Sequence, residues 1–255
     1  MSHAVFRLRA ERLARSTRPF IARGSKSPRC SRCRVLPSHC LCALQPQASS
    51  NAAVCLLMHD VEALKPTNTG WLIADVIRDT FAFGWQRTHV DPALLALLED
   101  PRFEPYLVFP GEFVQPPSRV VNTVAMSSGK RPLFILLDAT WTEARKMFRK
   151  SPYLDRFPVL SLAPEEISRY RLRRSRRDDH FCTAEVAAMC LGLAGETGAA
   201  QALDTWLDLF SSHYLAAKRG LPRPQLADPQ ASAALAREGQ SCATSMPASI
   251  TAQPR

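Results

Sequence analysis

The chain has 255 residues, of which 46% are hydrophobic and 22% are charged, a composition typical of a globular protein with one main domain and a small appendage. Thirty-three Lys and Arg residues against 23 Asp and Glu residues give a formal net charge of +10. This excess favours an anionic partner, nucleic acid ahead of a membrane, because no basic amphipathic helix stands out. No apolar run approaches the roughly 20 residues of a membrane span, so the composition argues against an integral membrane protein.

The first 28 residues are rich in arginine and lack the continuous apolar core of a secretory signal. We predict a flexible basic arm over residues 1–28, with an organelle transit peptide as the alternative. The expected compartment is therefore the cytoplasm. Thiols stay reduced there, so closely spaced cysteines indicate a metal site more readily than disulfides. The sequence leaves the oligomeric state open, and a monomer is our working expectation.

Four of the eight cysteines lie close together, in a Cys-x-x-Cys pair followed by a Cys-x-Cys pair: Cys30, Cys33, Cys40 and Cys42. Two thiolate pairs at such spacings suit a tetrahedral Zn²⁺ site with four sulfur ligands. Four ligands leave no position for water or substrate, so we predict a structural zinc knuckle over residues 29–45. Disulfides or unrelated free thiols are the alternative. Arginines around the cysteines make this knuckle a candidate RNA-contacting surface.

Strands and helices are expected to alternate along the rest of the chain. Strands are predicted over residues 53–58, 106–109, 133–137 and 159–162. Helices are predicted from Trp71 to about Asp79, from Asp91, from Trp141, from about Thr183, and over residues 202–218. This alternation predicts an α/β fold, with a mostly parallel sheet flanked by helices in a catalytic domain over residues 50–220. Residues 222–255 have few aromatics and much Ala, Ser and Pro, so we expect a disordered tail.

Asp138 directly follows five apolar residues, a pattern typical of a strand that is buried on both faces. In open α/β sheets, ligands bind beyond the carboxyl ends of the strands, where Asp138 should lie. Thr140 and Glu143 have the spacing of a helix capping box, which gives Thr140 a structural alternative to a catalytic role. Trp141 is either a core residue or part of the same site.

Three further groups of residues are predicted RNA contacts. They are a loop after the first strand (Lys65, Thr67, Asn68), the helix after Asp138 (Arg145, Lys146) and an arginine-rich segment (Arg169, Tyr170, Arg171, Arg173). Guanidinium groups suit phosphates, and a tyrosine can stack on a base. The alternatives are turn chemistry for the loop and a solvated charged surface for the other two.

Six motifs occur in one order along residues 29–195: the four-cysteine knuckle, residues 65–70, 107–110, 138–141, 168–173 and 183–185. In this order they resemble the DTW-domain proteins, whose Asp-x-Thr-Trp motif is intact at Asp138, Thr140 and Trp141. The resemblance implies a SPOUT-like fold, a class that includes knotted backbones. It also implies a tRNA-uridine aminocarboxypropyltransferase that uses S-adenosylmethionine as donor.

By this resemblance, the protein would move the 3-amino-3-carboxypropyl group of S-adenosylmethionine to N3 of a tRNA uridine and release 5′-methylthioadenosine. The modified nucleoside would be acp3U, expected at position 47 in the variable loop. The nearest alternative is a SPOUT-like RNA methyltransferase, which would release S-adenosylhomocysteine instead. A non-enzymatic, zinc-containing RNA-binding protein is the alternative of a different class.

The same resemblance suggests roles within the site. Asp138 would take the proton from N3 or orient the uridine, and burial should raise its pKa above the usual ~3.9 if it is the base. A role as counterion to the sulfonium is less suitable, because that charge disappears in the transition state. We expect the turn at Phe109, Pro110 and Gly111 to hold the adenosine. The start of the helix at Thr183 and Glu185 would hold the methionyl carboxylate.

Overall fold

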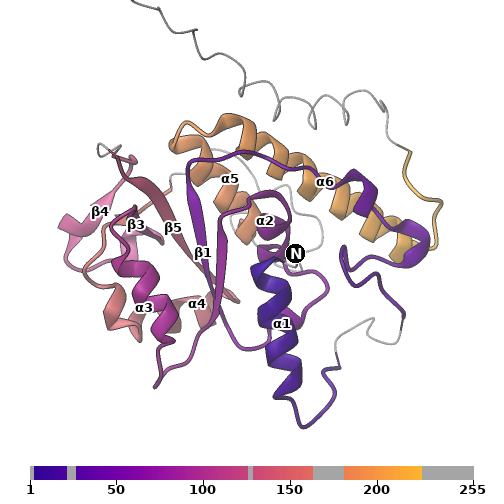
Figure 1. Cartoon of the computed structure of the whole chain (residues 1–255), viewed down its shortest axis with the longest axis horizontal. Coiled ribbons are helices and arrows are strands. Elements are labelled where there is room, and N and C mark those ends of the chain that lie inside the picture. Colours follow the sequence, from indigo (N-terminus) through magenta and orange to yellow (C-terminus); the bar gives the residue numbers. More distant parts are fainter. Residues whose placement is uncertain (1–2, 22–26, 126–128, 163–180, 226–255) are drawn as a thin grey trace, which may run out of the picture.

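The computed structural model describes residues 3–21, 27–125, 129–162 and 181–225. Within these ranges, six strands form one sheet in which every neighbouring pair is parallel (Figure 1). The strand order is β2-β1-β5-β3-β6-β4. The strands are β1 (Ala53–Met58), β2 (Thr80–Gly84), β3 (Phe103–Val108), β4 (Val120–Val121), β5 (Arg131–Asp138) and β6 (Val159–Leu160).

Helices cover both faces of this sheet (Figure 1). One face packs against α1 (Ala4–Ala14), α2 (Gly70–Val76), α5 (Thr183–Leu193) and α6 (Thr197–Arg219), and the other against α3 (Pro92–Glu99) and α4 (Trp141–Arg149). Short 3₁₀ helices complete the described elements: η1 (Pro37–His39), η2 (Cys42–Leu44), η3 (Glu62–Leu64), η4 (Gly111–Phe113), η5 (Pro117–Arg119) and η6 (Pro152–Leu154). None of the described helices is both long and apolar enough to cross a bilayer.

The central strands are buried on both faces, as their unbroken apolar sequences predict. In β1, Val54 and Leu56 face one helical layer while Cys55 and Leu57 face the other, and all four are fully buried or nearly so. The α/β fold with a parallel sheet is therefore confirmed. The arginine-rich segment with Arg169, Tyr170, Arg171 and Arg173 lies outside the described residues. So does most of the predicted tail.

Two strands were not predicted from the sequence. The helix expected from Trp71 to about Asp79 ends at Val76, and β2 begins four residues later. Strand β2 lies at the sheet edge, only its Thr80 is buried, and its apolar run of three residues is shorter than the runs of the central strands. Strand β4 has two residues, too few to produce a recognisable pattern.

The N-terminal segment differs from the flexible arm that we expected. Residues 4–14 form α1, whose N-cap His3 accepts a hydrogen bond from the Phe6 N–H. Val5 and Leu8 are buried against the core, and Arg9 donates to the backbone carbonyls of residues 63 and 64. Apolar residues three positions apart give α1 a face that packs on the domain, despite its many arginines.

The sheet has a topological switch point between β1 and β5. After β1 the chain passes through α2 on one face to reach β2, whereas after β5 it passes through α4 on the other face to reach β6. These two strands are neighbours, and Met58 at the end of β1 is in register with Asp138 at the end of β5. The loops that leave them diverge, which is the arrangement that opens a ligand-binding crevice in α/β proteins.

Candidate active site

Asp138 lies at this switch point and is held by two other parts of the chain. Its side chain is buried, with an exposed fraction of 3% for the residue. One carboxylate oxygen accepts a hydrogen bond from Asn68 Nδ2 and the other from Thr183 Oγ1, each at 2.7 Å. The predicted position of Asp138 at a strand end is therefore confirmed, and the loop after β1, strand β5 and helix α5 meet at its side chain.

Residues 68–70 surround the Asp138 carboxylate closely. Asn68 is buried, and its Oδ1 accepts the N–H of Trp71 at 3.1 Å, which fixes the orientation of its amide. Gly70 lies so close that a Cβ added there would stand 2.4 Å from Asp138 Oδ2. Position 70 therefore requires a glycine, because the backbone there lies too close to the Asp138 carboxylate for a side chain. Asn68, which we predicted to contact RNA, has its side chain engaged inside the protein.

Trp141 contributes to an aromatic cluster beside the site. Its ring stacks on Phe109 at 5.6 Å between centroids and 10° between planes, and Phe109 also stacks on Phe148 at 4.3 Å and 8°. Phe113 meets Trp141 edge-on, and the Arg145 guanidinium lies 4.6 Å from the Phe113 centroid. Trp141 is 36% exposed. It is not a core residue, so part of the aromatic cluster lies at the surface next to the carboxyl edge of the sheet.

Thr140 has the structural role that its spacing to Glu143 predicts. It is the N-cap of α4, and both its backbone N–H and its hydroxyl donate to the Glu143 carboxylate, at 3.0 and 2.5 Å. Burial raises the pKa of Glu143, but these hydrogen bonds outweigh it and the pKa is lowered overall. His59, the residue after β1, places its Nδ1 3.4 Å from this carboxylate.

Glu62 is a buried carboxylate near Asp138 that the sequence analysis did not single out. It lies in η3, is 6% exposed and pairs with Lys65 Nζ at 2.5 Å. Burial is the main cause that raises its pKa, followed by the negative charge of Asp138, while Lys65 acts in the opposite direction. The only available signal was its position in the loop after a buried strand. Lys65, a predicted RNA contact, is committed to this ion pair.

The two predicted donor-binding segments lie at the same edge of the sheet. Gly111 follows β3 and donates its N–H to Ser161 Oγ at 3.0 Å, so the turn after Phe109 is fixed against the end of β6. Helix α5 begins at Thr183, as predicted, and its N-cap is Cys182. Glu185 is buried and accepts the Cys182 N–H at 2.7 Å.

The four predicted metal ligands come together in space. The cysteine Sγ atoms all lie within 4.8 Å of one another, and three of the pairs are separated by 3.5, 3.7 and 3.7 Å: Cys30–Cys42, Cys33–Cys40 and Cys30–Cys40. A tetrahedral zinc with Zn–S bonds of about 2.3 Å separates its sulfurs by about 3.8 Å. The pKa values differ within the cluster: burial raises those of Cys33 and Cys42, whereas at Cys30 hydrogen bonds to the Cys33 and Arg32 backbone outweigh burial and lower the pKa to about 7. The sulfur separations are therefore the feature that fits Zn²⁺.

Arg34 connects this cluster to the loop that holds Asp138. It has a positive φ of 63°, donates its N–H to the Cys30 carbonyl at 2.9 Å, and is only 5% exposed. Its Nη1 donates to the backbone carbonyl of Asn68 at 2.7 Å. Its guanidinium lies 4.6 Å from the Trp71 ring centroid and 5.1 Å from that of Phe210. Of the remaining predicted RNA contacts, Arg145 and Lys146 are exposed on α4, and Thr67 lies in the loop before Asn68.

The parallel sheet, the polar cluster at its switch point and the N-terminal four-cysteine cluster define an α/β domain with a candidate ligand site at the carboxyl edge. The DTW-domain profile matches residues 27–215, and the chain belongs to the DTW-domain family, as its motifs indicate. A Drosophila melanogaster protein named tRNA-uridine aminocarboxypropyltransferase 2 is 25% identical over 174 residues. That match covers 65% of this chain and 66% of the relative, slightly less than two thirds of its length. No solved structure matches the chain significantly.

Proposed function

We propose that the protein is a tRNA-uridine aminocarboxypropyltransferase. The observation that carries the proposal is the Asp138 carboxylate, which is buried at the switch point and hydrogen-bonded by Asn68 and Thr183. Membership of the DTW-domain family and the name of the Drosophila relative support the reaction class and the tRNA substrate. S-adenosylmethionine is the proposed donor, and the proposed acceptor is N3 of a uridine, at position 47 of the variable loop.

In the proposed reaction, Asp138 accepts or directs the proton of uridine N3–H. The N3 electron pair then forms a bond to the carbon beside the sulfonium, and the bond from that carbon to sulfur breaks. The sulfur retains the bonding electrons, which neutralises its charge and gives 5′-methylthioadenosine. A carboxylate directed at N3 acts on the atom that becomes nucleophilic, whereas one directed at the sulfonium would stabilise the ground state more than the transition state.

Asn68 and Thr183 are proposed as positioning residues for Asp138. Their two hydrogen bonds approach different carboxylate oxygens, so the plane of the carboxylate is fixed before substrate arrives. The close approach of Gly70 limits movement on that side. Thr183 thereby has a defined contact with Asp138 in addition to its proposed place beside the donor.

The donor is proposed to lie on the β3 and β6 side of Asp138. The start of α5 would bind its carboxylate, with Thr183 at the first position, because the positive end of a helix dipole favours anions. The turn at Phe109, Pro110 and Gly111 would receive the adenosine. Glu185 supports the start of α5 through Cys182, and the stacked ring of Trp141 closes this side of the site.

Zn²⁺ is proposed to have a structural role, since four cysteines complete its coordination shell. RNA would contact the exposed Arg145 and Lys146 on α4. Roles for Thr67 in the loop after β1 and for Arg169, Tyr170, Arg171 and Arg173 stay predictions. The cytoplasmic location and the monomeric state also stay predictions.

The experiment that tests the function incubates the purified full chain with S-adenosylmethionine and tRNA lacking the modification. Chromatography with mass spectrometry then identifies both the modified nucleoside and the sulfur-containing product. We expect acp3U together with 5′-methylthioadenosine in equal amounts. A methylated nucleoside with S-adenosylhomocysteine would identify a methyltransferase. Absence of donor consumption, with tRNA bound, would support the non-enzymatic alternative.

A further inference from the structure

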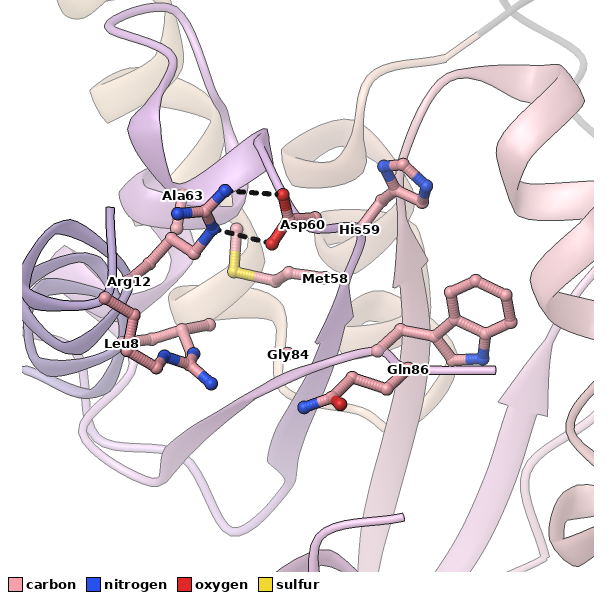
Figure 2. A pocket seen from close by; sticks show the side chains of 10 residues that line it. Leu8, Arg12, Met58, His59, Asp60, Ala63, Gly84 and Gln86 are labelled. Atoms are coloured by element: carbon pink, nitrogen blue, oxygen red, sulfur yellow. Dashed lines mark hydrogen bonds and ion pairs between the residues drawn. The ribbon is translucent and has the colours of Figure 1, made fainter. Parts of the chain in front are cut away.

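A pocket of about 450 Å³ lies outside the catalytic cluster, where β1 and β2 end beneath α1. Figure 2 shows Leu8 and Arg12 of α1 on one side and Gln86 on the other, with Met58 and Gly84 between them. The volume is within the range of pockets that hold a small organic ligand. The pocket exists because α1 packs across the ends of these strands, so the sequence prediction of a flexible arm could not reveal it.

Two arginines of α1 line this pocket, and they differ in how they are engaged. Arg12 donates to both oxygens of Asp60, at 2.6 and 2.7 Å, which holds α1 to the loop after β1 (Figure 2). Arg15 lies one helical turn further on and is exposed, and no described carboxylate lies within 4.0 Å of its guanidinium, although its charge acts on Asp60 from further away. The pocket therefore has one arginine fixed in place and one available for an external anion.

The rest of the lining suits a nucleobase. Leu8 and Met58 provide apolar surface, and His59 stacks near Trp85 with ring centroids 6.1 Å apart and planes inclined by 24°. Gln86 is exposed at the mouth and carries an amide that both donates and accepts hydrogen bonds. An apolar and aromatic surface, a hydrogen-bonding amide and a nearby guanidinium match the base and the phosphate of a nucleotide.

The position of the pocket relates it to the proposed RNA substrate. Met58, which lines the pocket, is in register with Asp138, and the N–H of His59 donates to the Asp138 backbone carbonyl at 3.0 Å. Neighbouring strands are only about 4.8 Å apart. The pocket therefore lies next to Asp138, on the β2 side, whereas the proposed donor site lies on the β3 side.

We propose that this pocket binds an unpaired nucleotide of the RNA substrate beside the target uridine, with its phosphate at Arg15 and its base between Met58 and Gln86. The inference rests on the proposed function and extends it to a second RNA subsite. RNA suits the pocket better than S-adenosylmethionine does, because the donor has a cationic sulfonium and no phosphate to pair with Arg15.

The test compares three variants of the full chain in tRNA binding and in steady-state kinetics. Arg15→Gln removes the available charge, and Gln86→Trp fills the mouth of the pocket without changing charge. Arg78→Gln is the matched control. Arg78 is an exposed arginine just before β2, at the amino ends of the strands, whereas the pocket lies at their carboxyl ends. Binding is measured from low to high salt, together with the KM values for tRNA and for S-adenosylmethionine.

We expect Arg15→Gln to weaken tRNA binding roughly fivefold to tenfold and to make the plot of log K against log salt shallower by about 0.7. Gln86→Trp should raise the KM for tRNA by a similar factor, and neither variant should change the KM for S-adenosylmethionine. The control Arg78→Gln should bind tRNA as the unmodified protein does. Circular dichroism of each variant checks that the fold is retained.

Two outcomes would overturn the inference. Equal losses in Arg15→Gln and Arg78→Gln would mean that only the overall charge matters. An unchanged KM for tRNA in Gln86→Trp would mean that no base enters the pocket. Either outcome can be observed only if the wild-type protein forms acp3U. Failure of the proposed function is different, because the wild-type protein would then form no acp3U.

Discussion

The Arg34 guanidinium donates to the backbone carbonyl of Asn68 at 2.7 Å, and so joins the four-cysteine cluster to the candidate active site. The side-chain amide of Asn68 in turn donates a hydrogen bond to Asp138, also at 2.7 Å. Two hydrogen bonds therefore lead from Arg34, which follows the cluster residue Cys33, to the proposed catalytic carboxylate. A structural metal at this place would affect more than local folding, because Arg34, next to Cys33, contacts the residue that positions Asp138.

Removal of the metal should therefore reduce both stability and activity. We expect one Zn²⁺ per chain, and we expect Cys33→Ser to lose it and to lower the Tm by roughly 10 °C, because metal binding stabilises the folded state. Elemental analysis measures the metal content, thermal unfolding measures the stability, and product formation measures the activity. Cys190→Ala, which alters a buried cysteine outside the cluster, should keep the metal. Zinc lost equally from both variants would contradict the assigned ligands.

Arg34→Lys should destabilise the protein although it keeps the charge. A lysine cannot lie flat on Trp71 and also reach the Asn68 carbonyl, so we expect a cost of about 2 kcal/mol in the free energy of unfolding, together with a lower kcat. Chemical denaturation and product formation measure these changes. Arg32→Lys, at an exposed position of the same knuckle, is the matched control and should have little effect. Similar losses of stability and kcat in both variants would show that Arg34 has no special role.

Gly70→Ala tests the close approach at the site. The added Cβ would stand 2.4 Å from Asp138 Oδ2, so the carboxylate must move, and we expect the rate to fall about 100-fold. Gly192→Ala is the control, because a Cβ at this exposed position of α5 would meet nothing within 4 Å. The two rates are measured with the same tRNA. A fully active Gly70→Ala protein would show that the position of the carboxylate is unimportant.

Glu62→Gln should alter the pH dependence of stability. Burial, and then the charge of Asp138, raise the pKa of Glu62 above its ordinary 4.5, so the folded protein binds this proton more tightly than the unfolded chain does. The stability from Glu62 is therefore complete below about pH 4.5 and is lost as the pH rises through its folded-state pKa. The neutral variant avoids this loss.

The measurement is thermal unfolding from pH 4 to pH 8. The Tm of Glu62→Gln relative to the unmodified protein should increase with pH across this range. Glu99→Gln, at an exposed carboxylate whose ion pair with Arg156 is long at 3.5 Å, should show no comparable trend. A relative Tm for Glu62→Gln that decreases as the pH rises would contradict the assignment.

Local patterns in the sequence predict the centre of the molecule well. The unbroken apolar residues of β1 and β5 identify buried parallel strands, and the acid at the end of β5 identifies the edge where the site lies. The spacing of four cysteines likewise predicts their cluster. In each case the deciding signal is contained within about a dozen neighbouring residues.

Features that depend on distant contacts could not be predicted in this way. Helix α1 is an arginine-rich segment by sequence, and it becomes part of the fold because Val5 and Leu8 reach the core. From the sequence, Asn68 is expected to be a turn residue or an RNA contact. Its positioning role follows only from its hydrogen bond to Asp138 in the structure. Glu62 is an ordinary loop acid until burial beside the same carboxylate raises its pKa.

The most direct test of the central claim is the single-turnover rate of Asp138→Asn with saturating S-adenosylmethionine and tRNA. Asparagine keeps the shape of the side chain but cannot accept the N3 proton, so we predict a rate about 10²–10⁴-fold lower, with unchanged binding of both substrates. Formation of acp3U at the rate of the unmodified protein would contradict a catalytic role for Asp138.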